Sequence, residues 1–87
     1  MYLIVVYDVA QERVSRVHAF LKRFLFWRQN SVFEGEVTQS QYREIVWGLE
    51  DLIDKERDSV MIYKLPSRSG LEFDVIGIEK RSMDLIL

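Results

Sequence analysis

The sequence of 87 residues contains no cysteine, one proline and one histidine. The absence of cysteine excludes a disulfide scaffold, a thiolate zinc site and a cysteine nucleophile. With one proline and no low-complexity tract, no linker is apparent, and we expect one domain over residues 1–87. The longest apolar run, Tyr2–Tyr7, is much shorter than the roughly 20 residues of a membrane span and has no basic leader. We therefore expect a cytoplasmic protein that does not bind membranes.

Acidic residues exceed basic residues only slightly, 14 against 12, but the charges are unevenly distributed. From Arg13 to Phe33 there are five basic residues and no acidic one, whereas from Glu34 to Asp58 there are eight acidic and three basic residues. Because salt limits electrostatic interactions to about 10 Å, the basic segment can bind a polyanion despite the negative total charge. The alternative is an ordinary solvated surface, and the charge pattern alone leaves both interpretations open.

The first half of the chain alternates between strand and helix patterns. Tyr2–Tyr7 is β-branched and aromatic without alternation, which predicts a central strand buried on both faces. A helix is predicted from Gln11, because apolar residues then recur at helical spacing: Val14, Val17, Leu21 and Phe24. Phe26–Val37 is extended again, as two short strands or one bent strand, with Gly35 as a turn or bulge.

The second half repeats the alternation. Thr38 and Gln41 have the spacing of a capping box, and the apolar periodicity after them predicts a helix ending near Lys55. Ser59–Leu65 is a strong strand candidate, and Phe73–Ile78 is predicted to be another strand.

This order of elements favours an α+β fold of the ferredoxin-like kind, a β-α-β-β-α-β sandwich. The apolar tail Met83–Leu87 would be an additional C-terminal strand. Because such a strand leaves an uncovered edge in a small domain, we expect it to be exchanged with, or added to, the sheet of a second copy in a homodimer.

Asp8 is the residue with the clearest chemical potential, because it directly follows a buried strand that would hold its carboxylate rigidly at the end of the sheet. It can be a metal ligand, or it can cap the first helix or pair with Arg13 or Arg16. A single carboxylate is a poor magnesium site. A two-fold axis near the strand end would supply a second Asp8, and the pair could hold a hydrated divalent cation against a phosphodiester.

Three segments together resemble the CRISPR-associated Cas2 family, in the family's order and spacing. They are Val5-Val-Tyr-Asp-Val9, Gln29-Asn-Ser-Val-Phe-Glu-Gly35 and Asp58-Ser-Val-Met-Ile-Tyr63. The resemblance implies a ferredoxin-like homodimer whose C-terminal strand joins the partner's sheet. It also implies an endonuclease that depends on Mg²⁺ or Mn²⁺ and cleaves single-stranded RNA or double-stranded DNA.

The resemblance further implies roles for six residues of this chain. Asp8 corresponds to the family's metal ligand and Tyr7 to its neighbouring tyrosine. The phosphate-binding arginine of the first helix is Arg13 or Arg16. Ser31 and Phe33 correspond to the family's second-strand motif and would line the cleft of the dimer.

Two functions fit this resemblance. In the first, an Asp8 pair binds the metal and the protein cleaves nucleic acid. In the second, the dimer is a non-catalytic scaffold for spacer acquisition, which forms a complex with the CRISPR integrase and grips spacer-precursor DNA through its basic helix surface. A small-molecule-binding regulatory domain would need a ligand cleft that the sequence does not indicate.

Overall fold

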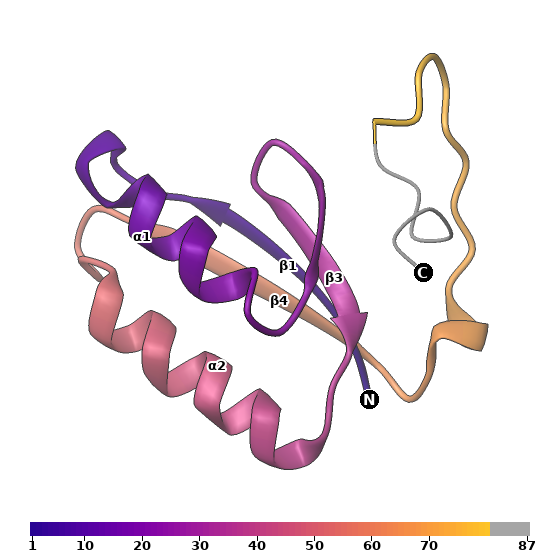
Figure 1. The fold of residues 1–87 in the computed structure, drawn as a ribbon, viewed down its shortest axis with the longest axis horizontal. Coiled ribbons are helices and arrows are strands. Elements are labelled where there is room, and N and C mark those ends of the chain that lie inside the picture. The colour runs from indigo at the N-terminus through magenta and orange to yellow at the C-terminus, as the bar shows by residue number, and fades with distance from the viewer. Residues whose placement is uncertain (81–87) are drawn as a thin grey trace.

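The computed structural model describes residues 1–80, in which the main elements follow the order β1, α1, β2, β3, α2, β4 (Figure 1). Their bounds are Tyr2–Asp8 (β1), Gln11–Leu21 (α1), Phe26–Gln29 (β2), Val32–Glu36 (β3), Gln39–Leu52 (α2) and Ser59–Leu65 (β4), with a short 3₁₀ helix at Arg68–Gly70. The strands form one sheet in the order β2-β3-β1-β4, and all neighbours are antiparallel. This arrangement confirms the predicted ferredoxin-like topology.

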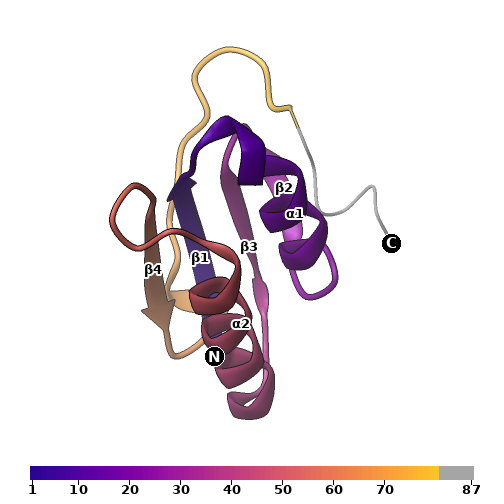
Figure 2. The ribbon, with the colours of Figure 1, turned by 90° about the vertical axis from the view of Figure 1, so that its left-hand side faces the viewer.

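Both helices lie on one face of the sheet, and the hydrophobic core fills the space between these two layers (Figure 2). Alternate residues of each strand point into this core because successive side chains face opposite sides of a sheet. Both helices contribute an apolar stripe to the same space. The fully or almost fully buried residues of the core include Leu3, Val5, Val17, Leu21, Phe33, Ile45 and Leu49. Among residues 1–80, no helix is long and apolar enough to cross a membrane.

Strand β1 is central, as predicted, and pairs with β3 on one side and β4 on the other. The prediction that both of its faces are buried holds only on the helix side. On the other side, which we call the open face, Ile4 and Val6 are only partly buried, and Met61 and Tyr63 of β4 are about half exposed. No helix of the described chain covers this face. Residues 71–80 cross it above Ile4 and Glu34, and the apolar surface of Met61 and Tyr63 remains in contact with water.

Residues 26–37 form two strands rather than one bent strand. The chain reverses direction at Asn30, which has a positive φ of 43°. Asparagine tolerates this left-handed backbone conformation better than most residues do. The Trp27 indole N–H donates a hydrogen bond of 2.8 Å to the Asn30 carbonyl across this turn. Gly35 lies inside β3 instead of marking a turn, and the irregularity of the ladder falls between Trp27 and Gln29.

The capping box predicted for α2 is confirmed. The Thr38 hydroxyl accepts a hydrogen bond from the Gln41 backbone N–H, and the Gln41 side-chain oxygen accepts one from the Thr38 N–H, at 3.1 and 2.9 Å. These two bonds satisfy donors that would otherwise lack a partner at the start of the helix. The helix ends at Leu52, three residues before the expected end near Lys55.

The prediction of a strand at Phe73–Ile78 is wrong, because residues 71–80 are irregular. The apolar side chains of this segment have little surface to pack against within the described chain: Ile76 is 99% exposed and Ile78 is 85% exposed. A strand needs a neighbouring strand to satisfy its backbone groups, and this segment pairs with none in residues 1–80. The predicted additional strand, Met83–Leu87, lies outside the described residues.

Candidate functional site

Asp8 is the last residue of β1 and its side chain is exposed at the end of the open face. Strand alternation places it on the same side as Ile4 and Val6, and it lies directly opposite Ser59 of β4. Within residues 1–80, the Asp8 carboxylate has no hydrogen-bond or salt-bridge partner. A rigid strand therefore presents a carboxylate that no neighbouring side chain neutralises.

Another residue, Asp58, makes the contacts at the start of α1 and with Arg13 that were the structural alternatives for Asp8. Its Oδ1 accepts a hydrogen bond of 2.9 Å from the backbone N–H of Ala10, the residue that precedes α1 and has no side-chain cap of its own. The Arg13 guanidinium donates to both oxygens of Asp58, at 2.6 Å from Nε and 3.0 Å from Nη2. Within residues 1–80, Asp8 thus neither caps α1 nor pairs with Arg13 or Arg16.

The Asp58 side chain is completely buried between the β1–α1 and α2–β4 connections. Its Oδ2 also accepts a hydrogen bond of 2.9 Å from the Asp54 N–H, so both carboxylate oxygens are satisfied. Hydrogen bonds from the Arg13 guanidinium and from backbone N–H groups hold the pKa of Asp58 well below its usual range. The same interaction raises the pKa of Arg13.

This depressed pKa predicts a pH-dependent stability. A carboxyl group whose pKa is lower in the folded state contributes stability above its unfolded pKa of about 3.9, and that contribution is lost as the pH falls towards the folded pKa. We expect the difference in the free energy of unfolding between wild type and Asp58→Asn to be full at pH 7 and to shrink below about pH 4. Urea unfolding at several pH values measures it; a difference that stays constant down to pH 2 would contradict the assignment.

Arg16, the other candidate arginine, lies exposed on α1. It borders a groove between α1 and α2 together with Arg23, Phe20 and Gly48. The Arg23 guanidinium lies 5.7 Å from the centre of the Phe20 ring, a cation–π arrangement. Neither arginine forms a salt bridge within the described part of the chain, so both can contact an external anion. Arg13, in contrast, is engaged with Asp58.

Tyr7 and Phe33 lie in the core, on the helix side of the sheet, and not with Asp8 on the open face. Their ring centres are 6.3 Å apart, and Phe33 is 0% exposed. The expectation that Phe33 lines a cleft between two chains is therefore not met in the described chain. Ser31 is in the β2–β3 turn, where its carbonyl accepts a hydrogen bond of 3.1 Å from the Tyr7 N–H. The Tyr7–Phe33 ring contact and the Tyr7–Ser31 hydrogen bond therefore hold the end of β1 in place next to Asp8.

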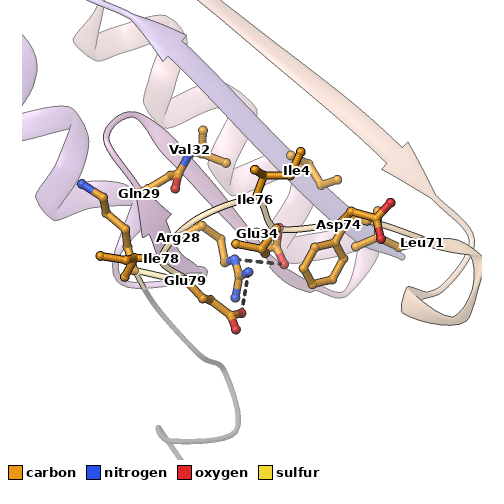
Figure 3. Close-up of a pocket in the computed structure, with 13 residues that line it drawn as sticks. Ile4, Arg28, Gln29, Val32, Glu34, Leu71, Asp74, Ile76, Ile78 and Glu79 are labelled. Atoms are coloured by element: carbon orange, nitrogen blue, oxygen red, sulfur yellow. Dashed lines mark hydrogen bonds and ion pairs between the residues drawn. The ribbon is translucent and has the colours of Figure 1, made fainter.

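A buried polar cluster on the open face was not predicted from the sequence. The Tyr2 hydroxyl donates a hydrogen bond of 3.0 Å to Glu34. Arg28 lies between Glu34 and Glu79, with N–O distances of 3.8 and 3.1 Å (Figure 3). Burial and the Glu34 carboxylate raise the pKa of Tyr2 to about 12. The cluster borders a cavity of about 300 Å³ beneath residues 71–80. Glu34 within a predicted strand was a signal, but the sequence does not indicate its contact with Tyr2, 32 positions earlier.

A metal site on one chain would be incomplete. No group of three His, Cys, Asp or Glu side chains within residues 1–80 could hold a metal ion. The chemistry of Asp8 fits a hard divalent cation such as Mg²⁺ or Mn²⁺, because an anionic oxygen is the ligand these ions prefer. The remaining ligands would have to be water, substrate phosphate or a second Asp8.

Comparison with known proteins identifies the family. The family model of CRISPR associated protein Cas2 matches residues 1–71. The chain belongs to the Cas2 family. Two relatives named CRISPR-associated endoribonuclease Cas2 match all of this chain: that of Methanothermobacter thermautotrophicus, 54% identical over 96% of its own length, and that of Thermococcus kodakarensis, 53% identical over its full length.

Solved structures of the Cas2 family have the same fold. A crystal structure of Cas2 that is 48% identical superimposes with a TM-score of 0.86 and covers 95% of this chain and 93% of its own. Cas2 of Streptococcus pyogenes, 30% identical, gives a TM-score of 0.78 and covers 88% of this chain and all of its own. The resemblance inferred from the three sequence segments is therefore confirmed.

Proposed function

We propose that this chain is a CRISPR-associated endoribonuclease that cleaves single-stranded RNA with the help of Mg²⁺ or Mn²⁺ held by Asp8. The observation that carries this proposal is the division of roles between two aspartates. Asp58 accepts the Ala10 N–H before α1 and pairs with Arg13, whereas Asp8 is exposed at the end of β1 and has no hydrogen-bond or salt-bridge partner within residues 1–80. The relatives that match the whole chain are named endoribonucleases, which supports the same activity.

The proposed active form is a homodimer formed through the open face. Met61 and Tyr63 are 51% and 50% exposed there, beside Val6 and outside the cavity beneath residues 71–80, so a second sheet could bury this apolar surface. A two-fold axis near the end of β1 would bring two Asp8 carboxylates together. This arrangement would supply the second anionic ligand that one chain lacks.

We also propose that Met83–Leu87 adds a strand to the partner's β4. Strand β4 is at the edge of the sheet, so it has backbone groups that are free to pair. Beside it runs an apolar groove between α2 and β4, lined by Val46, Leu49, Glu50, Ile53, Val60 and Ile62. The apolar side chains of the tail would fill this groove.

In this mechanism the described residues bind and orient the substrate. Asp8 would hold the metal, which supplies Lewis-acid stabilisation and an activated water when bound. Arg16 is the better candidate than Arg13 for contact with phosphate, since Arg13 is engaged by Asp58. Tyr7, Ser31 and Phe33 would act indirectly, by fixing the end of β1 against the core. We place this reaction in the cytoplasm, as expected from the sequence.

A second candidate function is a scaffold that binds spacer-precursor DNA and forms a complex with the CRISPR integrase. The observation that favours it is the pair of exposed arginines, Arg16 on α1 and Arg23 just after it, which border the groove between the helices. Such contacts would bind the sugar-phosphate backbone without cleaving it.

For this surface we expect Arg16→Glu/Arg23→Glu to weaken binding to double-stranded DNA. Loss of two phosphate contacts should also reduce the slope of log affinity against log salt by about 2. A filter-binding or anisotropy titration at several salt concentrations measures both quantities. Arg43→Glu/Lys55→Glu is a matched control, because it changes the charge equally on the acidic α2 side of the molecule. Unchanged affinity and slope would eliminate α1 as the binding surface.

The endoribonuclease proposal is tested by cleavage of labelled single-stranded RNA. Wild type and Asp8→Asn are compared with Mg²⁺, Mn²⁺ or EDTA, and sedimentation of the same samples determines whether they are dimers. Cleavage that requires metal and Asp8 supports the proposal. DNA binding and dimerisation without cleavage would support the scaffold instead.

A further inference from the structure

The tip of the Phe20 ring, on α1, lies against the backbone of α2 at Gly48. A Cβ atom at Gly48 would lie 2.6 and 2.7 Å from Cε1 and Cε2 of Phe20, and closer still to Cζ. A larger residue therefore does not fit at this position unless the ring moves. Glycine is less favourable than alanine in the interior of a helix, and here it allows the ring to pack directly on α2.

Arg23, just after α1, lies over two aromatic rings. The central carbon of its guanidinium is 5.7 Å from the centre of the Phe20 ring and 5.3 Å from the centre of the Phe24 ring. The two rings contact each other edge to face, with their centres 5.4 Å apart. Phe20 thus connects Arg23 to α2, because the same ring contacts the guanidinium and the backbone at Gly48.

These aromatic contacts leave the hydrogen-bonding groups of Arg23 free. A cation–π contact takes none of the five N–H groups of a guanidinium. Arg23 is exposed, and its guanidinium has no hydrogen bond or salt bridge within residues 1–80. It borders the groove between α1 and α2 together with Arg16, whereas Asp51 borders the groove from α2. The α1 side of this groove is therefore the side that suits a phosphate group.

We propose that Phe20 and Gly48 are positioning residues for Arg23, which hold its guanidinium at the groove in an arrangement ready to contact a phosphate of DNA. This inference rests on the proposed function as a scaffold that binds DNA. A long side chain that is already held in place loses less conformational freedom on binding, so its contact with phosphate is stronger. Arg16 has no cation–π contact within the described residues and lacks this support.

A double-mutant cycle tests the inference through the affinity for a labelled DNA duplex, measured by fluorescence anisotropy at several salt concentrations. Phe20→Leu keeps an apolar side chain against Gly48 but removes the ring. We expect it to weaken binding about threefold, the scale of one exposed cation–π contact. Arg23→Gln should weaken binding and reduce the slope of log affinity against log salt by about 1. In Arg23→Gln protein, Phe20→Leu should change the affinity less than about 1.5-fold, because no cation remains to be positioned.

Gly48→Ala is a second test of the same arrangement, because the added methyl group displaces the Phe20 ring without removing it. We expect it to weaken DNA binding in wild type and to have no effect in Arg23→Gln protein. Tyr42→Leu is a matched control, because it removes a ring that lies 4.9 Å from the Lys64 ammonium group and does not border the groove. This control should bind DNA like wild type. Circular dichroism verifies that each variant is folded.

Each alternative result has a distinct meaning. If Phe20→Leu weakens binding equally with and without Arg23, or does not weaken it, the inference is overturned and Phe20 serves helix packing only. Unchanged affinity in Arg23→Gln would overturn it as well. If wild type does not bind the duplex, or binds it no better than Arg16→Glu/Arg23→Glu, the proposed DNA-binding function of this surface itself fails. That failure is recognised before any Phe20 variant is measured.

Discussion

Asp8→Asn is expected to lower metal-dependent RNA cleavage at least about 100-fold while leaving the fold and the dimer unchanged. The loss corresponds to a few kcal/mol of transition-state stabilisation by the metal. Asparagine has nearly the same shape as aspartate but lacks the anionic oxygen that holds a hard cation. Because the Asp8 carboxylate is exposed and has no partner in residues 1–80, its replacement removes no contact on which folding depends.

The measurement is the single-turnover cleavage rate of labelled RNA over a range of Mn²⁺ concentrations. Glu44→Gln is a suitable control, because it removes another exposed carboxylate, on α2 in the helix layer of the molecule. We expect this control to cleave like wild type. If Asp8→Asn also cleaves like wild type, Asp8 is not the metal ligand and the proposed site is wrong.

The order of elements could be predicted from the sequence because it depends on local patterns. Three patterns depend only on residues that are close together in the sequence: the unbroken apolar run of β1, the helical spacing after Gln11 and the capping box at Thr38. The strand predicted at Phe73–Ile78 failed for a complementary reason. Strand propensity there is real, but a strand also needs a partner, and whether one exists depends on distant parts of the chain.

The same distinction applies to the candidate site. The position of Asp8 at the end of a buried strand is visible in the sequence. The contacts of Asp58 with the Ala10 N–H and with Arg13 are not, because these residues lie more than 40 positions earlier in the chain. The assignment of Phe33 to a cleft depended on the resemblance alone. Strand alternation, once the register is known, places this residue on the helix side.

Phe33→Ala is expected to destabilise the protein by about 4 kcal/mol, a large part of the roughly 5–15 kcal/mol by which native proteins are stable. Phe33 is fully buried, and its ring lies 5.0 Å from that of His18 and 6.3 Å from that of Tyr7. Truncation to alanine would leave a cavity between β3 and α1 that the surrounding core cannot fully close. Urea unfolding followed by tryptophan fluorescence measures the change in the free energy of unfolding.

Phe33→Leu is the companion variant that distinguishes a core residue from one that binds nucleic acid. Leucine keeps most of the buried apolar volume, so we expect it to cost about 1 to 2 kcal/mol and to retain cleavage at temperatures where the variant is folded. A residue that stacked on a nucleobase would behave in the opposite way, because leucine cannot replace an aromatic ring in stacking. A stable Phe33→Leu protein that no longer binds or cleaves RNA would therefore show that Phe33 leaves the core to contact the substrate. Retained cleavage would instead establish that Phe33 acts on the site only through the packing that holds β1 in place.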